Sequence, residues 1–103
     1  MNILLACSAG MSTSLLVSKM KEAADEQGVQ AEIWAAAQDK APEEIKKADV
    51  LLIGPQMRFM KKKFGKVADE QGIPLDIIDS VAYGRVDGKA VLDHAMKLLN
   101  EQK

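Results

Sequence analysis

The residue best suited to covalent chemistry in this chain is Cys7, its only cysteine. Cys7 directly follows an apolar run at residues 3–6 and precedes small and hydroxylated residues, after which a helical pattern begins near Leu15. This order predicts a strand, a tight loop and a helix, with the sulfur at the turn between strand and helix. A helix N-terminus can lower the pKa of a cysteine from about 8.5 to within roughly 3.5–7.5, which favours the nucleophilic thiolate.

The residues after Cys7 suit the binding of an anion. The first N–H groups of a helix have no acceptor within the helix, so a loop that enters a helix aims several donors and the positive end of the helix dipole at one point. The candidate phosphoryl-binding residues are Ser8, Ala9, Gly10, Met11, Ser12, Thr13 and Ser14. A sulfur nucleophile beside such a loop suggests a phosphocysteine; a small buried hydrophobic cysteine at a strand end is the alternative.

Length and composition bound the class of protein. The 103 residues fit one domain spanning 1–103, and a single cysteine excludes an internal disulfide and fits a reducing compartment. The net charge of −1 and the four aromatic side chains give no basis for binding nucleic acid. No signal-peptide pattern opens the chain, and no apolar run approaches the roughly 18 residues of a membrane span, so we expect a cytoplasmic protein.

Hydrophobic spacing predicts alternating strands and helices along the whole chain. After the first strand we expect a helix at 12–27, an edge strand at 30–36, a short helix from Pro42, a buried strand at 50–53, a helix from about Met57 to before Gly72, a strand at 75–78 and a last helix capped by Asp87. The inward face of the first helix is predicted to carry Leu15, Leu16, Met20, Ala23 and Ala24. This order indicates an α/β fold with one open four-stranded parallel sheet, strand order 2-1-3-4, and helices on both faces.

Three further residues are secondary candidates for the site. In a sheet of this order, ligands bind beyond the carboxyl ends of the strands, where the winding direction switches. Gln56 would face the cysteine loop there, either to contact a phosphoryl group or a partner, or to stabilise its own turn. Asp79, after the fourth strand, should orient backbone or partner groups, because an ionised carboxylate would repel a phosphate. Tyr83 either joins the site or covers the edge of the core.

Two remaining features favour plainer interpretations. Basic side chains gather on the predicted helix from Met57, and we interpret this run mainly as a solvated face, with a docking role for some of its members as the alternative. His94 is the only histidine, and its spacing from Cys7 matches no metal-ligand pattern. We therefore expect a surface histidine and neither a metal nor another cofactor.

Three segments of the sequence carry a family resemblance: ILLACSAGMSTSLL at 3–16, DVLLIGPQ at 49–56 and IDSVAYGRVDG at 78–88. Together they resemble the IIB subunit of the lactose/cellobiose/chitobiose branch of the phosphoenolpyruvate-dependent sugar phosphotransferase system. The resemblance implies a phosphocarrier, expected to be a monomer, in which Cys7 accepts a phosphoryl group from a histidine of the IIA protein. The group then passes to a sugar imported by the membrane protein IIC, at the inner face of the membrane. A cellobiose- or chitobiose-type β-glucoside is expected rather than lactose.

A low-molecular-weight cysteine phosphatase is the main alternative, because those enzymes resemble this strand, cysteine loop and helix. They place an arginine six residues after the nucleophile to clamp the phosphate, and here that position is Thr13. Their general acid is an aspartate followed by proline, whereas Asp79 is followed by Ser80. A response-regulator receiver is less compatible still, because the first strand offers no acidic residue.

Overall fold

The computed structural model describes residues 1–7, 10–37 and 39–101, and for Cys7 and residues 10–12 it describes the backbone alone. The elements are β1 (Asn2–Cys7), α1 (Gly10–Gln27), β2 (Glu32–Ala37), α2 (Ala41–Glu44), the 3₁₀ helix η1 (Ile45–Lys47), β3 (Val50–Ile53), the 3₁₀ helix η2 (Pro55–Met60), α3 (Lys61–Gln71), β4 (Leu75–Ile77), α4 (Ser80–Gly84) and α5 (Gly88–Glu101). The strands are parallel and lie in the order β2-β1-β3-β4. The predicted α/β fold and its strand order are confirmed.

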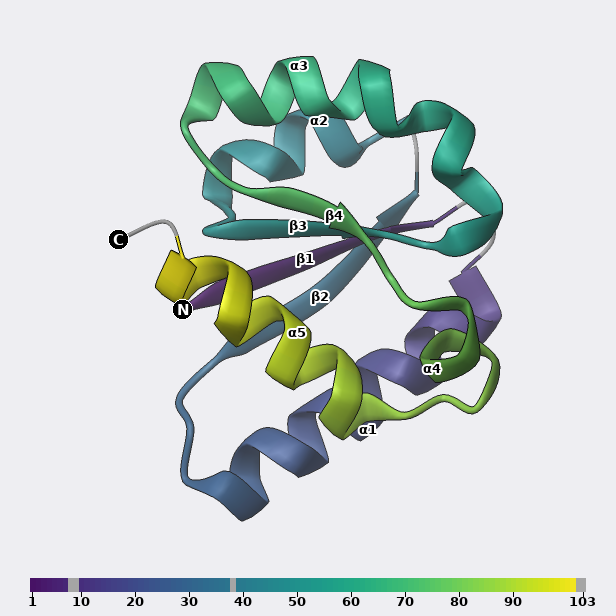
Figure 1. Cartoon of the computed structure of the whole chain (residues 1–103), viewed down its shortest axis with the longest axis vertical. Coiled ribbons are helices and arrows are strands. Elements are labelled where there is room, and N and C mark those ends of the chain that lie inside the picture. Colours follow the sequence, from purple (N-terminus) through teal and green to yellow (C-terminus); the bar gives the residue numbers. More distant parts are fainter. Residues whose placement is uncertain (8–9, 38, 102–103) are drawn as a thin grey trace.

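The sheet divides the core into two layers, which Figure 1 shows with α2 and α3 on one side and α1 and α5 on the other. Successive side chains of a strand point to opposite faces, so Ile3 and Leu5 pack with α1 and α5, whereas Leu4 and Ala6 pack with α2 and α3. Every residue of β3 is buried. The central strands are thus covered on both faces, as their continuous apolar sequences predict.

A glycine allows the two helices of one layer to approach closely. Gly88, the buried first residue of α5, lies against the backbone of α1, and a Cβ atom added there would be 2.3 Å from the carbonyl carbon of Lys19. No side chain fits at that distance. This contact joins the last helix of the chain to the helix that follows Cys7.

Several element boundaries differ from the predictions. Helix α1 begins at Gly10, two residues earlier than expected. Leu15 was assigned to its inward face but is 50% exposed. A helix turns about 100° per residue, so the buried side chains of Leu16 and Met20 lie about 100–140° around the helix from Leu15. The helix expected from Met57 begins only at Lys61, and Met57 lies in η2 with non-helical dihedral angles. The short helix α4 was not predicted, since it is too brief to show a helical period.

Candidate functional site

The ends of three parallel strands meet at one edge of the sheet. Ala6 of β1 pairs with Ile53 of β3, and the N–H of Gly54, just beyond β3, donates to the Ala6 carbonyl at 3.2 Å. The N–H of Ile78, just beyond β4, donates to the Ile53 carbonyl at 2.8 Å. The backbone of Cys7 therefore ends β1 beside the turn that follows β3, as the strand order predicts.

Only two residues separate this strand end from the following helix. Cys7 is the last residue of β1 and Gly10 is the first of α1. Ser8 and Ala9, both candidate phosphoryl-binding residues, lie outside the described residues, as do the side chains of the other candidates at positions 10–12. The first turn of α1 contains no acidic residue, so no carboxylate there opposes the positive end of the helix dipole.

The remaining two candidates of the loop differ in exposure. Ser14 is exposed, whereas Thr13 is only 1% exposed and is the one buried polar residue among those described. The hydroxyl oxygen of Thr13 lies 3.2 Å from that of Tyr83. Thr13 thus uses its hydroxyl within the protein, at the position where cysteine phosphatases carry their phosphate-clamping arginine.

Tyr83 connects three elements around the strand ends. Its hydroxyl oxygen contacts Thr13 on α1 and accepts a hydrogen bond from Nε2 of Gln56 on η2, at 3.0 Å. Tyr83 itself lies on α4 and packs against the core shared with α1. Tyr83 and Gln56, two of the three secondary candidates, therefore belong to one polar linkage, which we call the Thr13–Tyr83–Gln56 bridge. Sequence reasoning named all three residues without connecting them.

The turn after β3 is shaped around Gln56. A Cβ atom added to buried Gly54 would lie 2.7 Å from Oε1 of Gln56, so the side chain of Gln56 folds back over the glycine. This arrangement leaves Nε2 of Gln56 directed to Tyr83. A Cβ atom at Gly54 would displace the side-chain amide of Gln56, which holds the turn against α4.

Asp79 holds the short helix α4 in place. Its carboxylate is the N-cap of α4 and accepts a hydrogen bond from the N–H of Ala82 at 3.0 Å. Such caps stabilise a helix by about 1 kcal/mol and fix where it begins. Since α4 carries Tyr83, Asp79 acts on the bridge by holding this short helix in place.

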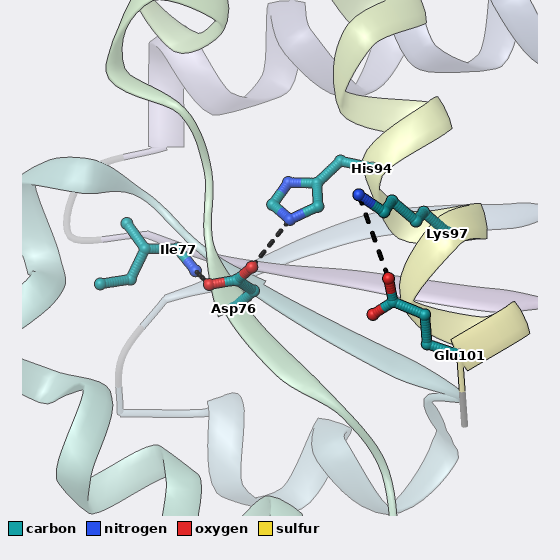
Figure 2. Close-up of polar contacts among 5 residues, drawn as sticks. All are labelled: Asp76, Ile77, His94, Lys97 and Glu101. Carbon is teal, nitrogen blue, oxygen red and sulfur yellow. Dashed lines mark hydrogen bonds and ion pairs between the residues drawn. The ribbon is translucent and has the colours of Figure 1, made fainter.

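His94, expected as a surface histidine, is partly exposed and has a partner that the sequence did not predict. Figure 2 shows His94 on α5 pointing to Asp76 on β4, with Nε2 lying 2.9 Å from Oδ2. Partial burial on its own raises the pKa of Asp76, but the hydrogen bonds from His94 and the N–H of Ile77, with the charge of Lys61, hold this pKa below its usual value. The pair ties α5 to the edge strand. A lone histidine in a sequence gives no sign of such a partner.

Within the described ranges, no three His, Cys, Asp or Glu side chains come together as a metal site would need. Over the same part of the chain, every helix is too short or too polar to cross a lipid bilayer.

The fold is a doubly wound α/β protein, and its candidate functional edge lies at the carboxyl ends of β1 and β3, where the winding direction switches. Residues 2–94 match the family model described as PTS system, Lactose/Cellobiose specific IIB subunit. The chain is 56% identical to the oligo-beta-mannoside-specific EIIB component of Bacillus subtilis, with 97% of each chain covered. It is 47% identical to the galactose-specific EIIB component of Lactococcus lactis, with 95% of each covered.

A solved structure agrees with these sequence relatives. The solution structure of the cellobiose-specific phosphotransferase IIB component from Borrelia burgdorferi has a TM-score of 0.83 and 40% identity, covering 100% of this chain and 94% of that one. The chain belongs to the lactose/cellobiose-specific IIB family of the phosphotransferase system, so the resemblance in the sequence is confirmed. Components of this family are phosphotransferases that move a phosphoryl group toward a sugar.

Proposed function

We propose that this chain is a single phosphocarrier domain, residues 1–103, in which Cys7 carries the phosphoryl group. Cys7 accepts the group from a phosphohistidine of IIA and passes it to a disaccharide that IIC imports. The observation that carries this proposal is the position of the only cysteine. Cys7 ends a central strand, and two residues separate it from the first residue of α1.

The proposed reaction consists of two displacements at phosphorus. In the first, the thiolate of Cys7 forms an S–P bond while the N–P bond of the phosphohistidine breaks, and the histidine leaves. In the second, a sugar hydroxyl forms an O–P bond and loses its proton while the S–P bond breaks and the thiolate leaves. Phosphoryl transfer spreads negative charge over the equatorial oxygens, which preorganised N–H donors stabilise. Residues 8–14 are the proposed source of these donors.

The Thr13–Tyr83–Gln56 bridge supports a positioning role for its members. It joins the first turn of α1 to η2 and α4, so it fixes the helix whose N–H groups would face the phosphoryl group. A carrier must also keep water from attacking the bound group. The buried Thr13 at the position of the phosphatase arginine supports transfer to a partner over hydrolysis.

The sugar remains a separate part of the proposal. The relatives are named for oligo-beta-mannosides, for galactose and for cellobiose. Oligo-beta-mannosides and cellobiose are β-linked saccharides, and these two names support a β-linked sugar here. We propose a cellobiose- or chitobiose-type β-glucoside. The IIB components of this system work with IIA and IIC in sugar transport, and we place this chain in the cytoplasm as a monomer, with transient contacts to IIC.

The test is to phosphorylate the protein with the general phosphotransferase components, a matched IIA and phosphoenolpyruvate, and to measure its intact mass. We expect one added phosphoryl group, mapped to Cys7 and absent from a Cys7→Ser variant treated in parallel. A Ser18→Ala variant, altered at an exposed position further along α1, is the matched control and should be labelled normally. A phosphoryl group on His94 or on an aspartate would contradict the proposal.

A second assay separates the phosphatase alternative. The protein is incubated with an aryl phosphate, and release of phosphate is followed through many turnovers. We expect no sustained hydrolysis, because no arginine occupies the clamping position. Sustained turnover that Cys7→Ser abolishes would favour a phosphatase.

A further inference from the structure

A basic hollow lies on the protein beside the functional edge. It is formed by η2 and α3, and it is lined by four basic residues, Phe59, Gly65 and one acidic residue: Arg58, Phe59, Lys61, Lys62, Gly65, Lys66 and Asp69. We call it the α3 hollow. Figure 1 shows η2 and the start of α3 at the same end of the molecule as α4 and the start of α1. The α3 hollow therefore adjoins the end of the protein that must meet its partners.

The charge of the chain is distributed unevenly around this hollow. Residues 58–66 contain five basic side chains and no acidic one, although the whole chain has 14 basic and 15 acidic residues and a net charge of −1. The remainder of the chain is consequently acidic. An anionic surface would attract this one face and repel the rest, so the attraction would also orient the molecule.

The cations of the α3 hollow are available for such an attraction. Among the described residues, the four ion pairs all lie elsewhere, and Lys61, Lys62 and Lys66 are exposed with no carboxylate within ion-pair distance. Phe59, which also lines the hollow, is 72% exposed, the most exposed large hydrophobic side chain described. Exposed aromatic and basic side chains together are typical of protein surfaces that bind the interface of anionic membranes.

Gly65 is unusual because the fold does not require it. It lies inside α3, where glycine costs roughly 0.5–1 kcal/mol relative to alanine, and a Cβ atom there would meet nothing within 4 Å. Gly65 lines the α3 hollow, so its missing side chain leaves open space in the lining. The opening is suited to a small anionic group such as a phosphate.

We infer that the α3 hollow binds the anionic phospholipid headgroups of the membrane, weakly and reversibly, and so orients this carrier beside its membrane partner. The inference rests on the proposed function, since a carrier that must reach a membrane protein gains from a search confined to the membrane surface. Each basic side chain near an anionic leaflet contributes about 1 kcal/mol, so a handful of cations gives attachment without permanent anchoring. Phe59 adds apolar contact at the headgroup level.

The experiment measures binding of the full chain to vesicles by co-sedimentation at low ionic strength. One set of vesicles is phosphatidylcholine alone, and the other contains phosphatidylglycerol in addition. We expect binding to the anionic set only, lost as salt is added. A Lys61→Gln/Lys62→Gln variant should bind roughly 25-fold more weakly, at about fivefold per lysine. Phe59→Ala should weaken binding by roughly fivefold through lost apolar contact.

The matched control is Lys21→Gln/Lys89→Gln, which removes two exposed lysines from α1 and α5 on the other side of the sheet. It should bind as the unchanged protein does. Equal binding to both sets of vesicles, or an equal loss in the control, would overturn the inference. No vesicle binding together with slower phosphoryl transfer to the lysine variant would also overturn it and assign the α3 hollow to an acidic protein surface. Phosphorylation of Cys7 in that same assay would leave the proposed function standing.

Discussion

The Thr13–Tyr83–Gln56 bridge makes a sharp prediction for stability. A Tyr83→Phe variant keeps the ring that packs on the core and removes only the hydroxyl that Thr13 and Gln56 contact. Loss of the Tyr83 hydroxyl removes one hydrogen-bond partner from Gln56 and one from Thr13, with different consequences. Gln56 is exposed and exchanges its bond for one to water, whereas the hydroxyl of Thr13 is buried and loses its partner.

The expected magnitude follows from this difference. A buried polar group left without its partner, here the Thr13 hydroxyl, costs about 1–3 kcal/mol. Loss of the hydrogen bond from the exposed Gln56 adds roughly 0.5 kcal/mol or less. We therefore expect Tyr83→Phe to lower the free energy of unfolding by about 1–3 kcal/mol. For a domain of this size each kcal/mol corresponds to about 4–8 °C in the melting temperature. Urea denaturation and thermal melting both resolve such a change.

A double-mutant cycle isolates the contact between the two hydroxyls. Thr13→Val preserves the shape of the side chain, and combined with Tyr83→Phe it should cost less than the sum of the two single variants, by about 1 kcal/mol. The matched cycle of Tyr83→Phe with Gln56→Ala should show a smaller coupling, since Gln56 is exposed. Additivity of Thr13→Val and Tyr83→Phe to within about 0.3 kcal/mol would refute the bridge as a stabilising link.

Three further predictions concern other parts of the fold. Gly88→Ala forces a Cβ atom to within 2.3 Å of the Lys19 carbonyl carbon and should destabilise the protein by at least about 1–3 kcal/mol in urea denaturation; an unchanged midpoint would contradict the close contact of α1 and α5. Gly65→Ala meets no neighbouring atom and should stabilise it by roughly 0.5–1 kcal/mol, and a loss would show that the glycine is needed by α3. The pKa of Asp76 is lowered in the folded protein, so its ionised carboxylate contributes to the free energy of unfolding. This contribution is fully present above the pKa of an unfolded aspartate, about 3.9, and is lost as the pH falls through the lower folded pKa. Urea midpoints measured as the pH falls through this range should therefore fall less in Asp76→Asn than in the unchanged protein; equal slopes would refute the linkage.

The sequence predicts the arrangement of the strands well, because its apolar runs are short, continuous and separated by turn residues. Val50 and its three successors are apolar without interruption and form a strand buried on both faces. The position of Cys7 at the end of the first strand was predicted on the same basis. From the strand order, the contact of the end of β1 with the turn at Gly54 follows directly.

The contacts between side chains could not be predicted in the same way. Thr13 and Tyr83 lie 70 residues apart, and nothing in either local sequence indicates that their hydroxyls meet. The pair of Asp76 and His94 depends on how α5 crosses β4, which no local pattern encodes. Leu15 was misplaced because an apolar residue next to Leu16 looks like part of the buried stripe, although its side chain lies at an exposed angle.

We propose that the thiolate of Cys7 binds the phosphoryl group covalently and that the backbone N–H groups of residues 8–14 donate hydrogen bonds to it. The most direct measurement compares the amide NMR spectra of the protein before and after phosphorylation by IIA. We expect the large changes in amide chemical shift to be confined to residues 7–14 and the adjoining turn at 54–56, with the shifts of α5 unchanged. Large shifts centred on His94 and Asp76, with those of residues 8–14 unmoved, would contradict it.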